Sequence, residues 1–264
     1  MNLIIGTSQL SKYFPKDYKI ILSRNIDFDY LKNNQWDSVY ITFAEQRRYE
    51  PNIDFITPNY IYTLDIINSL IHNSNKICCY GSSELWNQLS GCININNPPS
   101  YISDNDYIKS KILLIEKIKE LRQINPIYNK VILIHPMWFN SVGRCKSFLF
   151  GKIFDSIINK NQVKVGNINF LRDMVHTSFV CKKSIEATQD IMVGSGKLFN
   201  VREFIQDLYK LNGLDFNYYV KENLSIGQSV QPKFEPGVAD VPWNYTYQDL
   251  LNDTQNDIKQ FKVK

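Results

Sequence analysis

Two short stretches decide the fold: YGSSELW at residues 80–86, directly after an apolar run at residues 77–79, and YIKSK at residues 107–111. The first is typical of a buried strand that ends in hydroxyl side chains. The second opens a long amphipathic pattern, and on a helix Tyr107 and Lys111 share a face. A lysine in that place favours the charged phenolate and lowers the pKa of the phenol, so the tyrosine can act as an acid or base near neutral pH.

The spacing of this tyrosine and lysine is informative because it occurs once. Of the sixteen tyrosines, only Tyr107 is followed by a lysine four residues later. A serine at the preceding strand end, Ser82, is then able to hydrogen-bond the same substrate oxygen. Spacing alone is also compatible with an ordinary surface helix that carries a solvated lysine.

Further segments, taken in chain order, resemble the extended short-chain dehydrogenase/reductase superfamily, and its GDP-mannose 4,6-dehydratases most closely. The segment at residues 82–86, SSELW, is similar to the STSELY of these dehydratases. The other segments are NYIYTL at 59–64 (family NxxGTL), WFNSVG at 138–143 (YFNPVG), RDMVH at 172–176 (RDWGH) and NVREF at 200–204 (SVREF). Together they span nearly the whole chain in order, which makes the set more specific than any one motif.

The resemblance implies an α/β fold: a doubly wound parallel sheet (Rossmann-like) with a small C-terminal α+β substrate-binding cap. We expect the dinucleotide-binding Rossmann domain at residues 1–140. Residues 141–264 should form mainly the cap, interleaved with late elements of the Rossmann domain. The patterns predict strands at 3–5, 19–22, 39–42, 131–134 and 163–165, and helices at 59–72, 106–121, 148–158, from about 201, and 247–261. Ser103, Asp104 and Asn105 offer a cap for the helix that carries Tyr107.

The first turn departs from the family pattern. A dinucleotide-binding turn normally has two or three glycines, which let the pyrophosphate approach the backbone and a helix N-terminus. Here only the first glycine is kept, and the crossover before the next strand is short. The predicted cofactor contacts in this turn are Gly6, Thr7, Ser8, Gln9 and Leu10.

Other cofactor contacts follow from the strand ends and from the resemblance. At the end of the second strand, Ser23 and Arg24 suit the 2′-phosphate of NADP(H) better than the ribose diol of NAD(H). An ordinary surface arginine is the alternative. The resemblance adds Phe43, Ala44 and Trp138, besides Tyr107 and Lys111 themselves.

The catalytic roles are implied by the resemblance and permitted by the spacing. Tyr107 is the proton donor, Lys111 its electrostatic partner, and Ser82 a second hydrogen-bond donor to the substrate oxygen. Glu84 occupies the place of the base in the 4,6-dehydratases, with a structural hydrogen bond as the alternative role. The predicted substrate contacts are Ser83, Glu84, Asn140, Arg144 and Arg172; ordinary ion pairs are the alternative for the arginines.

Composition excludes several classes of function. A net charge of +4 with scattered basic residues argues against a nucleic-acid partner. No apolar run is long enough to span a bilayer, and the N-terminal residues enter a strand pattern directly, so we expect a cytoplasmic protein with no membrane partner. Five cysteines without CxxC spacing and three dispersed histidines suggest neither a disulfide framework nor a metal site.

The sequence therefore predicts an NADPH-dependent reductase of a keto group on a nucleotide-activated sugar, in surface-polysaccharide precursor biosynthesis. The alternatives are an NADP-dependent sugar-nucleotide 4,6-dehydratase that uses Glu84, and a non-catalytic family relative. The poor glycine turn favours a cofactor that exchanges, as in a reductase. The resemblance also implies a homodimer or a dimer of dimers, formed by the helices at 59–72 and 106–121.

Overall fold

The computed structural model describes residues 1–47, 50–86, 89–97, 99, 105–225 and 236–262. The chain divides into two compact units. Unit 1 comprises Met1–Trp86, Ile95–Pro136 and Cys181–Val193, and unit 2 comprises Asn87–Asn94, Met137–Val180 and Gly194–Lys264.

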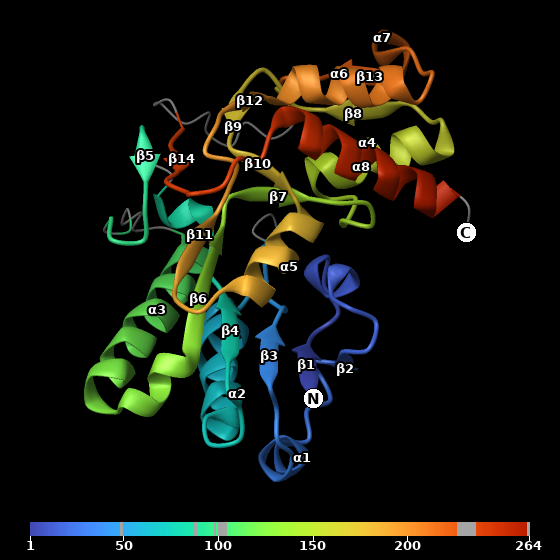
Figure 1. Cartoon of the computed structure of the whole chain (residues 1–264). Helices are drawn as coiled ribbons and strands as arrows, with labels where there is room; N and C mark the ends of the chain where they lie inside the picture. The colour runs from blue at the N-terminus through green and yellow to red at the C-terminus, as the bar shows by residue number, and fades with distance from the viewer. Residues whose placement is uncertain (48–49, 87–88, 98, 100–104, 226–235, 263–264) are drawn as a thin grey trace. The chain divides into compact units, whose positions relative to one another are not determined.

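Unit 1 is built on a six-stranded sheet in the order β11-β6-β4-β3-β1-β2, in which every neighbouring pair is parallel (Figure 1). The strands are β1 (Asn2–Ile5), β2 (Lys19–Ile21), β3 (Ser38–Ile41), β4 (Ile77–Tyr80), β6 (Val131–Pro136) and β11 (Ile191–Val193). The middle strands β4 and β6 are buried throughout, which explains their unbroken apolar runs. The edge strand β2 is the most exposed of the six.

The strand order places a topological switch point beside β1, because β2 and β3 flank it on opposite sides. In open parallel sheets, ligands bind at the carboxyl ends of the strands that flank such a point. The crossover from β1 to β2 contains only a 3₁₀ helix, η1 (Leu10–Tyr13). The later crossovers contain α1 (Phe28–Asn33), a π-helical turn η2 (Thr57–Ile61) with α2 (Tyr62–Leu70), and α3 (Asp106–Ile124).

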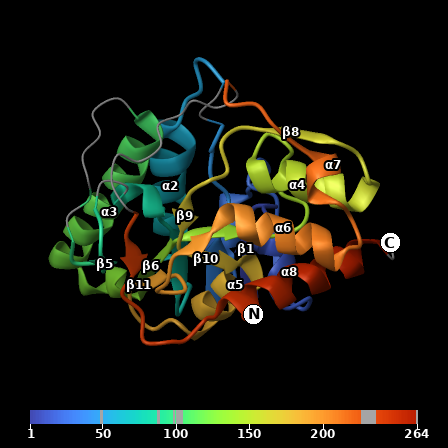
Figure 2. The same ribbon diagram turned by 90° about the horizontal axis from the view of Figure 1, so that it is seen from above.

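The helices α2 and α3 lie together on one side of the sheet, as both ribbon views show (Figures 1 and 2). The long helix α3 begins at an N-cap, Asn105, whose side chain accepts a hydrogen bond from the Ile108 N–H. It ends before Pro126, since the residue preceding a proline disfavours helical backbone. Its buried stripe includes both Tyr107 and Lys111.

Unit 2 combines helices with short two-stranded pairs. Its main helices are α4 (Leu149–Asn159), α6 (Val201–Leu211) and α8 (Tyr247–Lys262), with the short α7 (Phe216–Tyr219). Its pairs are β7 (Trp138–Asn140) with β10 (Met174–His176), β9 (Leu171–Arg172) with β12 (Phe199–Asn200), β8 (Val163–Val165) with β13 (Val220–Glu222), and β5 (Cys92–Ile93) with β14 (Val238–Ala239). Helices α6 and α8 are joined by the bond from the Tyr247 hydroxyl to Asp207 at 2.6 Å.

The predicted fold class is confirmed, since the sheet is parallel, flanked by helices and doubly wound. Most predicted elements occur within a residue or two. The expected helix at 59–72 starts as a π-helical turn, and the helix expected at 106–121 extends one turn further. The patterns missed α1, β11 and α5 (Thr177–Glu186), and Ser103 and Asp104, proposed as caps, lie outside the described residues. That unit 1 binds a dinucleotide and unit 2 a substrate stays a prediction.

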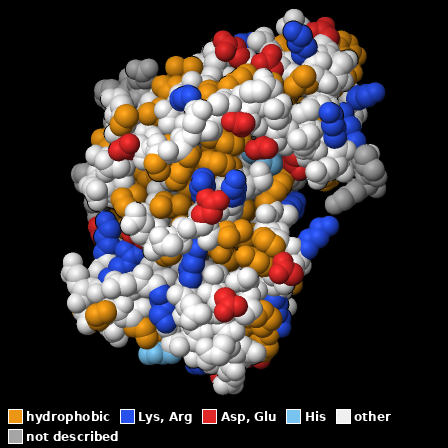
Figure 3. Space-filling view, in the orientation of Figure 1, with side chains coloured by type: hydrophobic (Ala, Val, Ile, Leu, Met, Phe, Trp, Pro, Cys, Tyr) orange, Lys and Arg blue, Asp and Glu red, His pale blue; other side chains and the backbone are white. Residues whose placement is uncertain are grey.

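Two surface properties bear on the excluded classes. On the face drawn in Figure 3, basic and acidic side chains are interspersed with apolar ones and neither sign gathers into one patch. Among the residues that the structure describes, no helix combines the length and the apolar character that a membrane crossing requires.

Candidate active site

Tyr107 and Lys111 lie in the first turns of α3 and are both buried, with exposed fractions of 5% and 4%. The Lys111 ammonium donates a hydrogen bond of 2.9 Å to the backbone carbonyl of Tyr80, at the end of β4. Burial lowers the pKa of Lys111 to about 8 because the charged form loses its hydration. The lysine is therefore anchored at the carboxyl end of the sheet and is still mostly charged at neutral pH.

Ser82 stands in the tight turn that follows β4. Its hydroxyl accepts the Glu84 N–H at 3.3 Å, and its carbonyl accepts the Leu85 N–H at 3.3 Å, so it begins the 3₁₀ helix η3 (Ser83–Trp86). A serine hydroxyl that accepts a bond still has a hydrogen to donate. Ser82 is thus held in place while keeping the donor that carbonyl chemistry needs. Ser83 and Glu84 form the first turn of η3 beside it.

Gly81 is fixed in this turn by a close neighbour. Its N–H donates to the Ile134 carbonyl of β6 at 2.8 Å, and a Cβ built on it would stand 2.2 Å from Nδ1 of His135. His135 is itself buried, and the Trp86 ring meets it edge-on; in the part of the chain that the structure describes, its Nδ1 has no hydrogen-bond partner. Burial lowers the pKa of His135 to about 4, so the ring is neutral at physiological pH.

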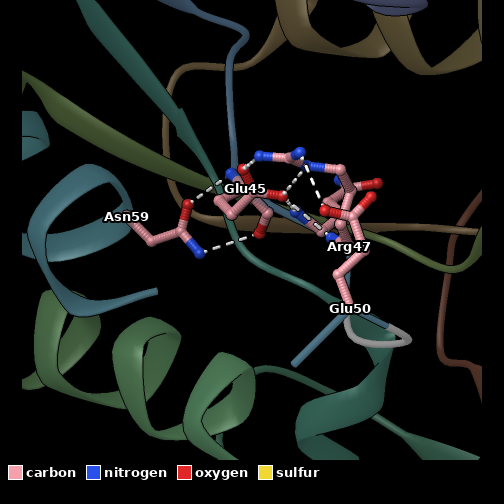
Figure 4. A network of polar contacts seen from close by, with 5 residues as sticks. Glu45, Arg47, Glu50 and Asn59 are labelled. Carbon is pink, nitrogen blue, oxygen red and sulfur yellow. Dashed lines mark hydrogen bonds and ion pairs between the residues drawn. The ribbon is translucent and has the colours of Figure 1, made fainter. Parts of the chain in front are cut away.

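A hydrogen-bond network connects the loop after β3 to the turn of α3 that carries Tyr107, and Figure 4 shows its part between Glu45 and Asn59. The Asn59 amide accepts the Glu45 N–H at 2.7 Å and donates to the Glu45 carbonyl at 3.0 Å. It also donates to Ser110 Oγ at 3.2 Å, and Ser110 donates to the Tyr107 carbonyl at 2.7 Å. Asn59 therefore links three segments of unit 1: the loop after β3, the turn η2 and the first turns of α3.

The same loop is stiffened by an ion pair that Figure 4 also draws. The Arg47 guanidinium donates to both oxygens of Glu45, at 3.0 and 2.7 Å, and to Glu50 at 3.0 Å. These bonds lower the pKa of Glu45. The carboxylate thus organises the loop that follows the predicted cofactor contacts Phe43 and Ala44.

The turn after β1 places Gly6 at the switch point with a φ of +103°, a conformation that favours glycine. Thr7 is exposed, and Ser8 and Gln9 are half-buried, whereas Leu10 is buried in the core. Leu10 thus contributes packing, and its contact with the cofactor stays a prediction. The hydroxyls of Thr7 and Ser8 are the polar groups that the turn presents.

At the end of β2, Ser23 is half-buried and Arg24 is exposed. The Ser23 carbonyl accepts a bond of 2.8 Å from the Tyr62 hydroxyl of α2, which fixes this strand end against the helix. The guanidinium of Arg24 is therefore presented to solvent at the carboxyl end of the strand next to β1.

These donors fit a nicotinamide dinucleotide at the carboxyl ends of β1, β2 and β4. Hydroxyls, a buried lysine and an exposed guanidinium are the groups that bind ribose and phosphate oxygens. Held there, the group would contact Tyr107, Lys111 and the turn after Gly6. Among the described residues, no three or more His, Cys, Asp or Glu side chains cluster to hold a metal ion.

The remaining predicted contacts belong to unit 2. Trp138 on β7 packs against Phe150 and Phe170, and the Arg172 guanidinium lies over Phe170 at 4.9 Å and over Trp138 at 6.0 Å. The structure thus brings Trp138 and Arg172 together. Asn140 is 7% exposed at the end of β7, and Arg144 lies over the Phe148 ring at 4.2 Å.

Asp173 is a buried residue whose carboxylate holds two other segments of unit 2 by hydrogen bonds. Its carboxylate accepts four hydrogen bonds, from the Ser195 N–H and hydroxyl at 2.6 and 2.7 Å, the Ala239 N–H at 2.9 Å and the Gly196 N–H at 3.1 Å. A Cβ on Gly194 would stand 2.6 Å from this carboxylate. Burial raises the pKa of Asp173 although the bonds oppose the shift. This arrangement agrees with a role in ordering loops.

Sequence reasoning missed the polar groups that contact Lys111 and the turn that carries Tyr107. Ser110 and the Tyr80 carbonyl were not singled out, and Asn59 was noted only as part of a motif. Ser110 lies three residues after Tyr107, a spacing that places it on the same side of a helix. That spacing was the available signal, whereas the backbone carbonyl has none.

Comparison with solved structures gives strong likenesses over the whole chain. RMD from Pseudomonas aeruginosa in complex with NADPH matches at a TM-score of 0.74 and 16% identity, covering 98% of this chain and 99% of that one. The UDP-Glc/GlcNAc 4-epimerase from Campylobacter jejuni matches at 0.70 and 16%, covering 98% and 99%. The dTDP-glucose 4,6-dehydratase from Bacillus anthracis in complex with NAD matches at 0.70 and 14%, covering 100% and 97%.

Comparison of the sequence with models of known protein families and with curated proteins gives no match. The structural likenesses establish the fold. This chain has the Rossmann-type fold with a second unit that these proteins share, as the motif resemblance implied.

Proposed function

We propose that this protein is an extended short-chain dehydrogenase/reductase that uses NADPH to reduce a keto group on a nucleotide-activated sugar. The observation that carries the proposal is the set of groups at the end of β4. Lys111 is buried on the Tyr80 carbonyl one turn from Tyr107, and Ser82 keeps a hydroxyl hydrogen to donate in the turn after β4. The NADPH complex of RMD and the nucleotide-sugar names of the other two structures support the class of reaction.

In this reaction, the substrate carbonyl gains a hydride on carbon and a proton on oxygen, which gives an alcohol. The bound dinucleotide supplies the hydride. Tyr107 gives its hydroxyl proton to the oxygen, and Ser82 donates a hydrogen bond that stabilises the negative charge as it develops. The charge of Lys111 stabilises the phenolate that remains.

Side chains at two further places carry the proposed specificity. Arg24, exposed beside Ser23 at the end of β2, receives the 2′-phosphate and thereby favours NADPH over NADH. In unit 2, Asn140, Arg144 and Arg172 carry the amide and guanidinium groups proposed to bind the sugar nucleotide.

The second candidate is a 4,6-dehydratase, which Glu84 supports by its place in the first turn of η3, two residues from Ser82. A dehydratase returns the hydride to its substrate and so keeps its cofactor through the cycle. The single glycine of the first turn argues for exchange, and therefore for reduction. A non-catalytic relative is the third reading, and the buried Lys111 argues against it, because burying an ammonium costs stability.

The proposal is tested by screening the purified protein for NADPH oxidation against a panel of keto-sugar nucleotides. We expect consumption of NADPH with at least one of them, at a rate at least about 100-fold lower in Tyr107→Phe. NADPH should bind at least about tenfold more tightly than NADH, and Arg24→Ala should remove most of that difference. Equal affinities in the unmodified protein would rule out the role of Arg24.

A further inference from the structure

The turn that follows β1 is closed by its own serines. The Ser8 N–H donates to Ser11 Oγ at 2.9 Å, and the Ser11 hydroxyl donates back to the Ser8 carbonyl at 2.8 Å. The Leu10 N–H donates to Ser8 Oγ at 3.1 Å. This reciprocal pattern, related to a capping box, satisfies the Ser8 N–H and the first amide of η1, that of Leu10, within the turn itself. Ser11 is only 7% exposed, so the closure is part of the packed structure.

The space that a glycine usually leaves for a ligand is also taken. The Gly6 N–H donates to the Ile21 carbonyl at 2.8 Å, and a Cβ built on Gly6 would lie 2.7 Å from Cβ of Phe43. The loop after β3 therefore fills the place beside Gly6. In this chain the absent side chain accommodates Phe43.

A pyrophosphate bound at such a turn takes its hydrogen bonds from free backbone amides and gains from the dipole of the helix that follows. Here the amides of Gly6, Ser8 and Leu10 already have partners, and the helix that follows is a four-residue 3₁₀ helix. Any dinucleotide bound here must compete with bonds that the turn makes to itself.

We propose that Ser11 sets the affinity for the dinucleotide: by holding the Ser8 N–H it keeps the turn closed, so NADP(H) binds weakly and exchanges in each cycle. This inference rests on the proposed function and deepens it. Weak binding suits a reductase, which must release NADP⁺ and take up NADPH after each turnover. The role of Ser11 is that of a positioning residue, because it acts through the Ser8 amide.

The test compares NADPH affinity, measured by titration of the nucleotide fluorescence, in four proteins. Ser11→Ala removes the acceptor of the Ser8 N–H and should tighten binding by about tenfold, the effect of one added bond to a charged acceptor. Ser11→Thr keeps a hydroxyl and should bind like the unmodified protein. Ser69→Ala is the matched control, since it removes a serine hydroxyl that bonds only within α2.

Amide hydrogen exchange provides a readout that is independent of both activity and affinity. In the unmodified protein without nucleotide, the Ser8 amide should be protected from exchange. In Ser11→Ala it should exchange faster and regain protection when NADPH is added. A Ser8 amide that exchanges freely in the unmodified protein would overturn the inference, even if Ser11→Ala fails to fold.

The outcomes separate this inference from the proposed function. If the unmodified protein binds NADPH at micromolar concentration or below, or if Ser11→Ala binds no more tightly, the inference is wrong and the reductase proposal stands. If neither protein binds NADPH while Ser8 is protected as expected, both the inference and the NADPH-dependent function are wrong.

Discussion

At the scale of single residues, the candidate site depends on two buried polar side chains, Tyr107 and Lys111, and on whether Lys111 is charged. Lys111 gains one hydrogen bond, to the Tyr80 carbonyl, in return for losing its hydration, and its pKa falls to about 8. A buried cation of this kind is costly, so its retention beside Tyr107 is informative. The Lys111 charge, which the proposed mechanism uses to stabilise a Tyr107 phenolate, is largely present at neutral pH.

The first prediction concerns the proton donor. Tyr107→Phe removes the hydroxyl and keeps the ring that meets Phe55 edge-on, so the fold should survive. The rate of keto-sugar reduction should fall at least about 100-fold, the usual contribution of a general acid. Tyr128→Phe is the matched control, because its hydroxyl bonds to Asn68 on the exposed surface of unit 1. Equal turnover in the two variants would contradict the role of Tyr107.

The second prediction concerns acid sensitivity through His135. Its folded pKa of about 4 lies below the unfolded value of about 6.5, so the unfolded chain binds a proton first as the pH falls. Stability from this group is present above pH ~6.5 and is lost as the pH falls through about 4, with a total of about 3 kcal/mol.

The measurement for His135 is the free energy of unfolding in urea between neutral and acid pH. His135→Gln should flatten the acid side of the profile relative to the unmodified protein. His72→Gln, at an exposed position, should leave the profile unchanged. If the free energy of unfolding falls with decreasing pH equally steeply in His135→Gln and in the unmodified protein, the His135 ring does not control the loss of stability in acid.

At the scale of elements, the crossover from β1 to β2 sets this chain apart from a standard dinucleotide-binding unit. The twelve-residue interval at 7–18 has room only for η1, where a standard unit has an α-helix. The sequence indicated both the missing glycines and the shortness of this crossover. It could not indicate the Ser8–Ser11 closure, because that depends on how two hydroxyls orient within a turn.

Long, periodic segments were the most predictable elements, for a physical reason. The helix α3 is long, has an N-cap and buries one stripe of mainly apolar residues, and strands β4 and β6 are nearly continuous apolar runs, so local pattern and burial agree. The short pairs of unit 2, such as β5 with β14, join residues far apart in sequence and have no local signal. The same holds for Asp173, whose partners come from two distant segments.

The third prediction tests the hydrogen bonds that Asn59 makes to Glu45 and Ser110. Asn59→Leu leaves the N–H and the carbonyl of the half-buried Glu45 without the Asn59 side chain, and each lost hydrogen bond costs roughly 0.5–1.5 kcal/mol. Turnover should fall as well, because Ser110 loses its tie to the loop after β3.

Unfolding in urea and steady-state kinetics together check the Asn59 prediction. Asn68→Ala, on the exposed side of α2, should change stability by less than about 0.5 kcal/mol. A destabilised Asn59→Leu protein with unchanged turnover would mean that the network supports the fold and does not position Tyr107.

At the scale of the whole molecule, we expect self-association through unit 1. The helices α2 and α3 lie side by side (Figure 2), and apolar side chains are exposed beside α2 and on α3: Ile61 at the end of η2 is 47% exposed and Leu113 on α3 is 38% exposed. Covering such positions is favourable, and the motif resemblance implies a homodimer or a dimer of dimers at these helices.

The fourth prediction follows from that expectation. Light scattering at micromolar concentration should give the mass of a dimer or tetramer, and Leu113→Glu should shift it towards the monomer by placing a charge in the contact. Leu224→Glu, an exposed site in unit 2, should leave the mass unchanged. A monomeric unmodified protein would contradict the expectation.

We propose that the site formed by Ser82, Tyr107 and Lys111 catalyses reduction of a keto sugar with oxidation of NADPH. The most direct measurement follows both the cofactor and the sugar product for the unmodified protein and for Glu84→Gln, which keeps size and hydrogen bonding but removes a base. We expect one NADPH to be oxidised for each keto group reduced. The rate should change little in Glu84→Gln, since a reduction deprotonates no carbon acid. Formation of a 6-deoxy-4-keto product with unchanged cofactor, abolished in Glu84→Gln, would contradict it.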